Sequence, residues 1–344
     1  KSERIEFQGS QGDKLAARLD APNGTVRGYA LFAHCFTCSK DVFAASRIAS
    51  ALAAHGIATL RFDFTGLGAS EGEFANTNFS SNVADLVAAA NWLRENRAAP
   101  ELLIGHSLGG AAVLAGAGDI AELKAVATIG APADADHVVH NFQASLDAIE
   151  SDGQATVSLA GREFTIKKQF LDDVRGTSLK DRISALKPAL IVFHAPLDQT
   201  VGIENASAIF SAARHPKSFV SLDGADHLLS RRQDAVFVAD VLAGWANRFL
   251  PVAERPKSPP SGTVRVRETL QGKFQQDVMV DDRHLLADEP SSVGGDGTGP
   301  SPYDYLSIAL GTCTSMTLRM YADFKKLQLG RVTVDVTHGK VHAD

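Results

Sequence analysis

The chain has 344 residues, of which 44% are hydrophobic and 22% charged, with a formal net charge of −6. This length is enough for about two domains. The negative balance, without a clustered basic patch, excludes a general nucleic-acid binder and a protein that docks on anionic membranes. No apolar run reaches the ~18 residues of a membrane span and no signal-peptide core follows Lys1. We therefore expect a cytoplasmic protein.

Apolar runs and amphipathic stretches alternate along the chain to about residue 250. The expected strands are 4–7, 15–19, 29–33, 58–64, 101–104, 125–129, 189–193 and 218–222. The expected helices are 40–55, 81–97, a small-residue run at 111–115, 203–214 and 233–249. Such alternation predicts an α/β fold with a mostly parallel eight-stranded sheet that helices cover on both faces.

Residues 132–187 interrupt this alternation with a helical piece (137–149), a hairpin-like piece (156–166) and a charged stretch. An insertion of this length inside a compact domain is typically functional. We expect it to form a small cap over the site.

Ser107 stands at the centre of Gly105-His106-Ser107-Leu108-Gly109, between a predicted strand and a predicted helix. A G-x-S-x-G match in that context is typical of a nucleophile elbow, a strained turn that needs small residues on both sides of the serine. The helix start also brings its positive dipole end close to the nucleophile.

Two further candidates follow later strands. Asp198 comes just after the strand 189–193 and His227 after the strand 218–222, and ligand sites of open parallel sheets lie at such strand ends. The chain order is therefore serine, aspartate, histidine. Asp134 and Asp136 remain alternatives for the acid, since they follow the preceding strand.

These motifs resemble the α/β-hydrolase family, and among its members a carboxylesterase, over about residues 1–250. The order of Ser107, Asp198 and His227 matches the family order. The resemblance implies a serine hydrolase that cleaves small, short-chain carboxylic esters through an acyl-enzyme, with His227 as the base and Asp198 as its orienting acid.

The family's oxyanion hole normally includes a His-Gly-x segment, which here is His34-Cys35-Phe36. The resemblance therefore implies that the backbone N–H groups of Phe36 and Leu108 form this hole. His34 and His106 are expected to shape the site. No metal or organic cofactor is needed, and the expected partner is a small-molecule ester. A thioesterase or a peptidase of the same fold remains the alternative.

Cys35 and Cys38 form a Cys-x-x-Cys pair, a spacing found in redox dithiols and in half of some zinc sites. No second pair accompanies them, and three cysteines do not make a disulfide framework. We favour a structural role and keep the redox role open.

A proline-rich stretch at 251–262 predicts a linker. Residues 263–344 that follow it differ from the first 250 residues in their sequence pattern. We expect a long hairpin over 263–280, a glycine-rich loop at 294–302, a long apolar helix bearing 306–314, and a strand at 331–338.

This second segment resembles the OsmC family of thiol peroxidases, on Gly294-Gly295, residues 299–302 and the helical run that ends at Cys313. The resemblance implies an α+β domain, here C-terminally incomplete, that joins two chains in a homodimer. It would make Cys313 the peroxide-attacking thiol, although no resolving cysteine follows it. The open alternatives are a buried structural cysteine, a peroxidase whose hydrolase half only binds its substrate, and a mere interaction module.

Overall fold

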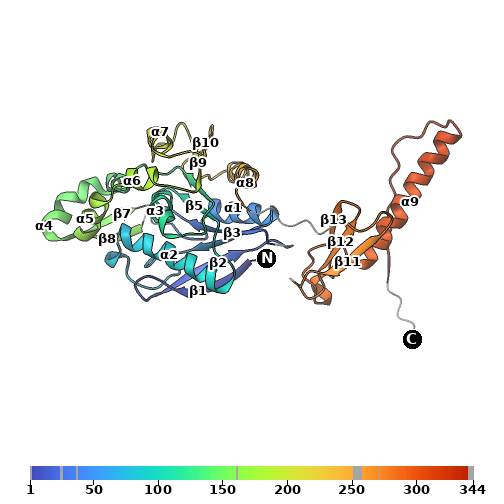
Figure 1. Ribbon diagram of the computed structural model, residues 1–344, viewed down its shortest axis with the longest axis horizontal. Helices are drawn as coiled ribbons and strands as arrows, with labels where there is room; N and C mark the ends of the chain where they lie inside the picture. Colours follow the sequence, from blue (N-terminus) through green and yellow to red (C-terminus); the bar gives the residue numbers. More distant parts are fainter. Residues whose placement is uncertain are drawn as a thin grey trace. The chain divides into compact units, whose positions relative to one another are not determined.

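The computed structural model describes residues 2–23, 26–35, 38–159, 162–250, 258–270 and 272–339. The chain divides into two compact units (Figure 1). The first contains Lys1–Pro22 and Val26–Ala253, and the second contains Asn23–Thr25 and Glu254–Asp344. In the described part of the chain, no helix is both long and apolar enough to cross a membrane.

An eight-stranded sheet forms the centre of the first unit, in the order β1-β2-β4-β3-β5-β6-β9-β10. Its strands are β1 (Ser2–Gln8), β2 (Lys14–Asp20), β3 (Gly28–Ala33), β4 (Ile57–Phe62), β5 (Leu102–His106), β6 (Ala125–Ile129), β9 (Ala189–His194) and β10 (Lys217–Ser221). Strand β2 pairs antiparallel with β1 and β4, and every other pairing is parallel. The predicted mostly parallel sheet is confirmed.

Alternate side chains of the central strands enter two separate cores, because successive residues of a strand point to opposite faces. Leu31 and Leu103 belong to one core. Phe32 and Ile104, their chain neighbours, belong to the other. Burial on both faces explains why these strands are continuous apolar runs.

Helices cover both faces of the sheet, as predicted (Figure 1). They are α1 (Phe43–Ala54), α2 (Phe79–Asn96), α3 (Leu108–Gly116), α7 (Ile203–Ala212) and α8 (Arg232–Ala246). Helices α1 and α8 pack on one core, and α2, α3 and α7 on the other. Every residue of α3 is buried, which its run of glycine, alanine and leucine allows. Two short 3-10 turns, η1 (Phe74–Asn76) and η2 (Ala117–Asp119), precede α2 and follow α3.

The segment between β6 and β9 forms a separate cluster of short elements. They are η3 (Ala135–Ser145), α4 (Leu146–Asp152), β7 (Gln154–Leu159), β8 (Arg162–Lys167), α5 (Lys168–Gly176) and α6 (Leu179–Ser184). The predicted hairpin is present as β7 and β8, which pair antiparallel. The single predicted helix is instead a 3-10 run followed by α4, because Phe142 leaves helical geometry while its buried ring packs on Phe170.

The second unit contains a three-stranded antiparallel sheet and one long helix (Figure 1). Its elements are β11 (Val264–Glu268), β12 (Gln276–Val280), β13 (Arg283–Ala287), the 3-10 turn η4 (Ser291–Val293) and α9 (Pro302–Phe324). Ser301 caps α9 by accepting a hydrogen bond from the Asp304 N–H, while the Asp304 carboxylate accepts from the Ser301 N–H.

The hairpin predicted over 263–280 is present as β11 and β12, which pair antiparallel. The sequence analysis did not predict β13, a five-residue strand that follows a tight turn and pairs antiparallel with β12. The predicted strand 331–338 is wrong. This stretch has no regular secondary structure, since no described strand pairs with it. It lies instead beside α9, where the rings of Tyr303 and His338 stack with their centroids 5.6 Å apart.

Candidate active site

Ser107 lies in the turn between β5 and α3, with φ 55° and ψ −125°. A non-glycine residue with positive φ is strained, as expected at a nucleophile elbow. A Cβ atom on Gly105 would lie 2.3 Å from the Gly109 carbonyl oxygen, and one on Gly109 would lie 2.3 Å from that of Ala33. The tight turn therefore requires both glycines.

The three predicted residues Ser107, Asp198 and His227 lie together at the carboxyl ends of β5, β9 and β10. The Ser107 Oγ is 3.0 Å from the His227 Nε2. On the other side of the same ring, Nδ1 is 2.7 Å from the Asp198 Oδ2. Because a carboxylate only accepts, Nδ1 carries the proton and Nε2 is left to accept from the serine hydroxyl.

The Asp198 carboxylate is fixed by the loop that bears it. Its Oδ1 accepts hydrogen bonds from the backbone N–H groups of Thr200, at 2.8 Å, and Val201, at 3.0 Å. Burial alone would raise the pKa of Asp198, but the hydrogen bonds from His227 and from the two N–H groups outweigh it, so the pKa lies below its ordinary value. Asp198 is therefore ionised at neutral pH.

The alternative acids hold other positions. The Asp134 carboxylate accepts a hydrogen bond from the Ala135 N–H at the start of η3. Asp136 is exposed on the same 3-10 helix. Asp226, the residue before His227, accepts hydrogen bonds from the backbone N–H and the hydroxyl of Ser230. The geometry thus assigns the His227 partner to Asp198.

His106, expected only to shape the site, makes a specific contact with it. Its buried Nε2 donates a hydrogen bond to the main-chain oxygen of His227, at 2.7 Å. Burial, followed by the charge of His227, lowers the pKa of His106 to about 4, so the ring is neutral at pH 7. The sequence offered one indication of a role for His106, its place between Gly105 and Ser107 in the motif. That place does not indicate a hydrogen bond to His227.

Two small hollows share Leu108, and Ser107 lines the first of them. One is lined by Ser107, Leu108, Pro132, His137, Val138, Thr200 and Val201. The other is lined by His34, Cys35, Phe64, Leu67, Phe79, Asn82, Leu108, Gly109 and Ala112. The first is partly walled by η3, so the segment between β6 and β9 contributes to the surroundings of Ser107.

Of the two predicted oxyanion donors, Leu108 is described and Phe36 is not. Leu108 is the first residue of α3, where a backbone N–H has no carbonyl partner within its helix. Phe36 lies outside the described residues.

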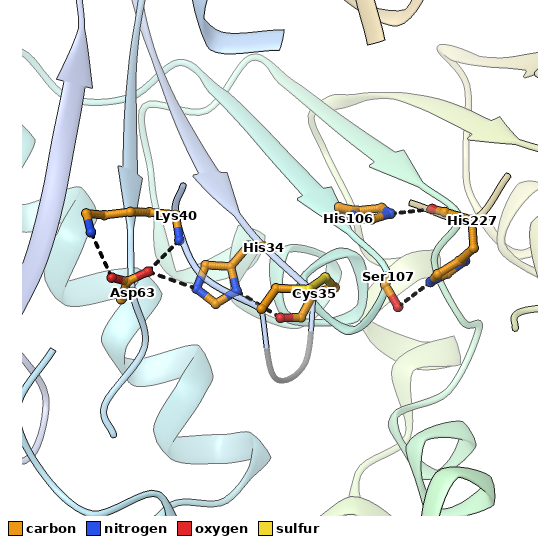
Figure 2. The surroundings of a disulfide bond; sticks show 8 residues. His34, Cys35, Lys40, Asp63, His106, Ser107 and His227 are labelled. Atoms are coloured by element: carbon orange, nitrogen blue, oxygen red, sulfur yellow. Dashed lines mark hydrogen bonds and ion pairs between the residues drawn. A yellow bond between two sulfur atoms is a disulfide. The ribbon is translucent and has the colours of Figure 1, made fainter. Parts of the chain in front are cut away.

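The segment that follows β3 carries a disulfide bond between Cys35 and Cys38 (Figure 2). The cysteine count had not predicted it. The Nδ1 of buried His34 donates to the Cys35 carbonyl oxygen at 2.8 Å, and its Nε2 faces Asp63 at 3.6 Å. Burial lowers the pKa of His34.

Asp63, a fully buried residue at the end of β4, anchors the same segment from the other side. Its carboxylate accepts hydrogen bonds from the backbone N–H and, at 2.9 Å, from the Nζ of Lys40, as Figure 2 shows. Arg61 donates to the Lys40 carbonyl oxygen and, at 2.8 Å, to Asp20. These buried charges are paired, as burial of ions requires.

Cys313 has a free thiol that is exposed on α9, so the buried structural alternative is wrong. Within the described ranges, no group of three or more histidine, cysteine, aspartate or glutamate side chains is arranged to hold a metal ion.

A model of the α/β hydrolase family matches residues 30–241, well over half of the chain. The chain belongs to the α/β hydrolase family. A model of OsmC-like proteins also matches residues 295–344, so an OsmC-like domain follows the hydrolase. No curated protein gives a significant match.

Among solved structures, this hydrolase is 53% identical to the esterase domain of a Rhodothermus marinus protein, over 72% of the present chain and 99% of that domain, with a TM-score of 0.61. Two further structures share the fold at 19% identity each. The α/β hydrolase GrgF from Penicillium sp. sh18 has a TM-score of 0.60 over 73% of the present chain and 99% of its own. Est1E from Butyrivibrio proteoclasticus with bound ferulic acid has a TM-score of 0.58 over 71% of the present chain and 98% of its own. The family match and the 53% identity to an esterase domain support hydrolase activity of the esterase type.

Proposed function

We propose that the first unit is a serine carboxylesterase that cleaves small, short-chain esters, with Ser107, His227 and Asp198 as its catalytic residues. The proposal depends above all on one observation, the hydrogen-bonded series from the Ser107 hydroxyl through the His227 ring to the Asp198 carboxylate. The esterase domain that is 53% identical supports the same activity.

In the proposed reaction, the Ser107 Oγ attacks the ester carbonyl carbon while the His227 Nε2 takes the hydroxyl proton. Asp198 holds the ring in the required tautomer and stabilises the imidazolium that forms. The N–H groups of Leu108 and Phe36 stabilise the negative oxygen of the tetrahedral intermediate. His227 then returns the proton to the departing alcohol. A water molecule releases the acid from Ser107 by the same steps.

The small hollow at Ser107 supports the preference for small substrates. Its walls include Pro132, Val138 and Val201, which offer apolar contact to a short acyl or alcohol group. A thioester or a peptide meets the same nucleophile, so thioesterase and peptidase activity are the alternatives to be compared in the assay.

For the second unit, we propose that residues 263–344 form an OsmC-like homodimerisation domain, joined through 251–262 to a hydrolase domain of residues 1–250 with a cap at 132–187. Helix α9 supports dimerisation, since among its described residues only Ala322 is buried. Thiol peroxidase activity is the second candidate, because the Cys313 thiol is free and exposed.

The test is the initial rate of hydrolysis of nitrophenyl esters of rising acyl length by the wild type and by Ser107→Ala. We expect turnover of short esters and a loss of at least about a thousandfold in the variant. Ser207→Ala, on the exposed side of α7, is the matched control and should keep the wild-type rate. Equal activity of wild type and Ser107→Ala would refute the proposal. A Cys313→Ser variant should keep ester turnover and lose any peroxide consumption.

A further inference from the structure

The described residues contain a disulfide bond, Cys35–Cys38, that has no part in the proposed ester hydrolysis. A bridge with two intervening residues closes so short a loop that it restricts the unfolded chain little, and the hydrolase unit already has two extensive apolar cores. Stabilisation of the fold is therefore a weak reason for it. Its position gives a stronger one.

Cys35 lies against the nucleophile elbow. Its buried side chain shares the wall of a cavity with Leu108 and Gly109, the two residues that follow Ser107. A Cβ atom on Gly109 would lie 2.4 Å from the His34 carbonyl oxygen, so the main chain just before Cys35 is in direct contact with the start of α3. Any shift of this main chain changes the surroundings of the nucleophile.

Both ends of the bridged segment are fixed by buried groups. At one end the Cys35 carbonyl oxygen accepts from the His34 ring, and from the Cys38 N–H at 3.1 Å. At the other end Lys40 is bound to Asp63 through its backbone and its ammonium group. The bridge links Cys35 and Cys38 covalently between these two sets of contacts. Phe36, whose N–H we assign to the oxyanion hole, is one of the two intervening residues.

The two sulfur atoms differ in their access to solvent. Cys35 is 4% exposed, whereas Cys38 is only partly buried. An external thiolate therefore reaches the Cys38 Sγ more readily, and Cys35 becomes the leaving group. This asymmetry is typical of exchange pairs, in which one sulfur is attacked and the other is protected.

We propose that Cys35 and Cys38 form a thiol–disulfide exchange site that controls ester hydrolysis, with a dithiol reductant as its reaction partner. This inference rests on the proposed function. One reductant thiolate attacks the Cys38 Sγ, the Cys35–Cys38 bond breaks, and the Cys35 thiolate leaves and takes a proton. The second reductant thiol attacks the mixed disulfide, which frees Cys38 as a thiol. The protein gains two electrons and two protons, and the reductant becomes a disulfide.

The oxidised enzyme is the active form. Reduction removes the covalent link at Cys35, whose side chain and preceding main chain lie against Leu108 and Gly109, and so displaces the start of α3 beside the nucleophile. Losing one oxyanion-hole donor, such as the Leu108 N–H, costs about 100- to 1,000-fold in kcat. A donor that is loosened rather than lost should cost about tenfold or more. KM should change little, because the donor acts mainly on the transition state.

The experiment uses the full chain with Cys313→Ser, so that only the pair can titrate. The protein is equilibrated with mixtures of reduced and oxidised dithiothreitol at constant pH. Free thiols are counted from the mass shift after alkylation, and kcat and KM are measured on nitrophenyl acetate. We expect kcat to fall at least tenfold as two thiols appear, and to recover on reoxidation. Cys35→Ala/Cys38→Ala should be fixed at the low rate and insensitive to the mixture.

An unchanged kcat with two thiols present would overturn the inference while leaving the esterase proposal intact. The same holds if no thiols appear in the folded protein, or if the rate falls only together with the far-UV circular dichroism signal. If the oxidised protein does not hydrolyse the ester, or if Ser107→Ala hydrolyses it equally well, the proposed function itself fails.

Discussion

The His106 Nε2 donates a hydrogen bond to the main-chain oxygen of His227, across 121 positions of the sequence. The residue before the candidate nucleophile thus holds the backbone of its candidate base. The centroids of the two imidazole rings lie 5.3 Å apart, so the end of β5 and the loop that bears His227 are in contact. The alignment of His227 with Ser107 therefore depends on a side chain that has no direct contact with the ester in the proposed mechanism.

We expect His106→Ala to lower kcat about 10- to 100-fold with a smaller change in KM, because the His227 loop loses its hydrogen-bond donor while the Ser107 nucleophile stays in place. His106→Gln, whose amide can donate to the same carbonyl oxygen, should recover part of the loss. The measurement is steady-state kinetics on a short nitrophenyl ester. His55→Gln, at a histidine whose side chain is 44% exposed and paired with Asp240, is the control and should behave as wild type. A rate for His106→Ala equal to that of the control would argue against this positioning role.

The low pKa of His106 predicts a pH dependence of stability. Its pKa is about 4 in the folded protein, against about 6.5 in an unfolded chain. Between these values the unfolded chain binds the extra proton, so the free energy of unfolding falls as the pH drops from about 6.5 towards 4. The loss should approach about 3 kcal/mol, since one pKa unit corresponds to about 1.4 kcal/mol. Urea unfolding of wild type and His106→Gln over this range measures it. If the free energy of unfolding of His106→Gln falls as steeply with pH as that of the wild type, the effect belongs to other groups. Buried His34 is one such group, since its lowered pKa acts in the same direction.

Asp198→Asn should reduce kcat by about 1,000- to 10,000-fold, because an amide no longer favours the tautomer of His227 that accepts the serine proton. Asp134→Asn, which changes the alternative acid in the same way, should leave kcat within about twofold. Initial rates on one short ester decide between the two residues. The opposite ranking would assign the acid to Asp134.

Gly130 combines a positive φ of 54° with close neighbours in the site. A Cβ atom there would lie 3.3 Å from the Asp198 Oδ2 and 3.4 Å from the His227 Nδ1. We expect Gly130→Ala to lower the free energy of unfolding by about 1 kcal/mol or more and to reduce kcat, since both the backbone and the Asp198–His227 contact are strained. Chemical denaturation and ester kinetics check both effects. Gly118→Ala is the control, because an added methyl group there would meet no described atom within 4 Å beyond its immediate chain neighbours and its own helix backbone. A similar response of both variants would show that the site does not constrain Gly130.

Most of the sheet could be predicted because its strands are continuous apolar runs. The candidate site could be predicted because motifs that follow neighbouring parallel strands meet at one edge of the sheet. Ser107, Asp198 and His227 were found in this way. The break at Phe142 was not, because it depends on packing against Phe170, which local periodicity does not specify.

The polar support of the site was also beyond sequence patterns. Asp63, Lys40 and His34 look like ordinary polar residues of a strand end and a loop, yet all three are buried. Only the long-range pairing of β3 with β4 brings them together. The Cys35–Cys38 bond likewise depends on a local backbone path that spacing permits without requiring it.

The segment between β6 and β9 leaves the sheet from one strand and returns to the strand paired with it. Its two ends are therefore held at a fixed separation whatever the intervening length or composition. Gly130 and η3 contact the site directly. We therefore expect only the outer part of this excursion, residues 146–184, to tolerate exchange for another segment while Ser107, Asp198 and His227 stay in place. Exchange of this outer part would then change the surroundings of the hollow at Ser107, whereas the positions of the proposed catalytic residues depend on the sheet.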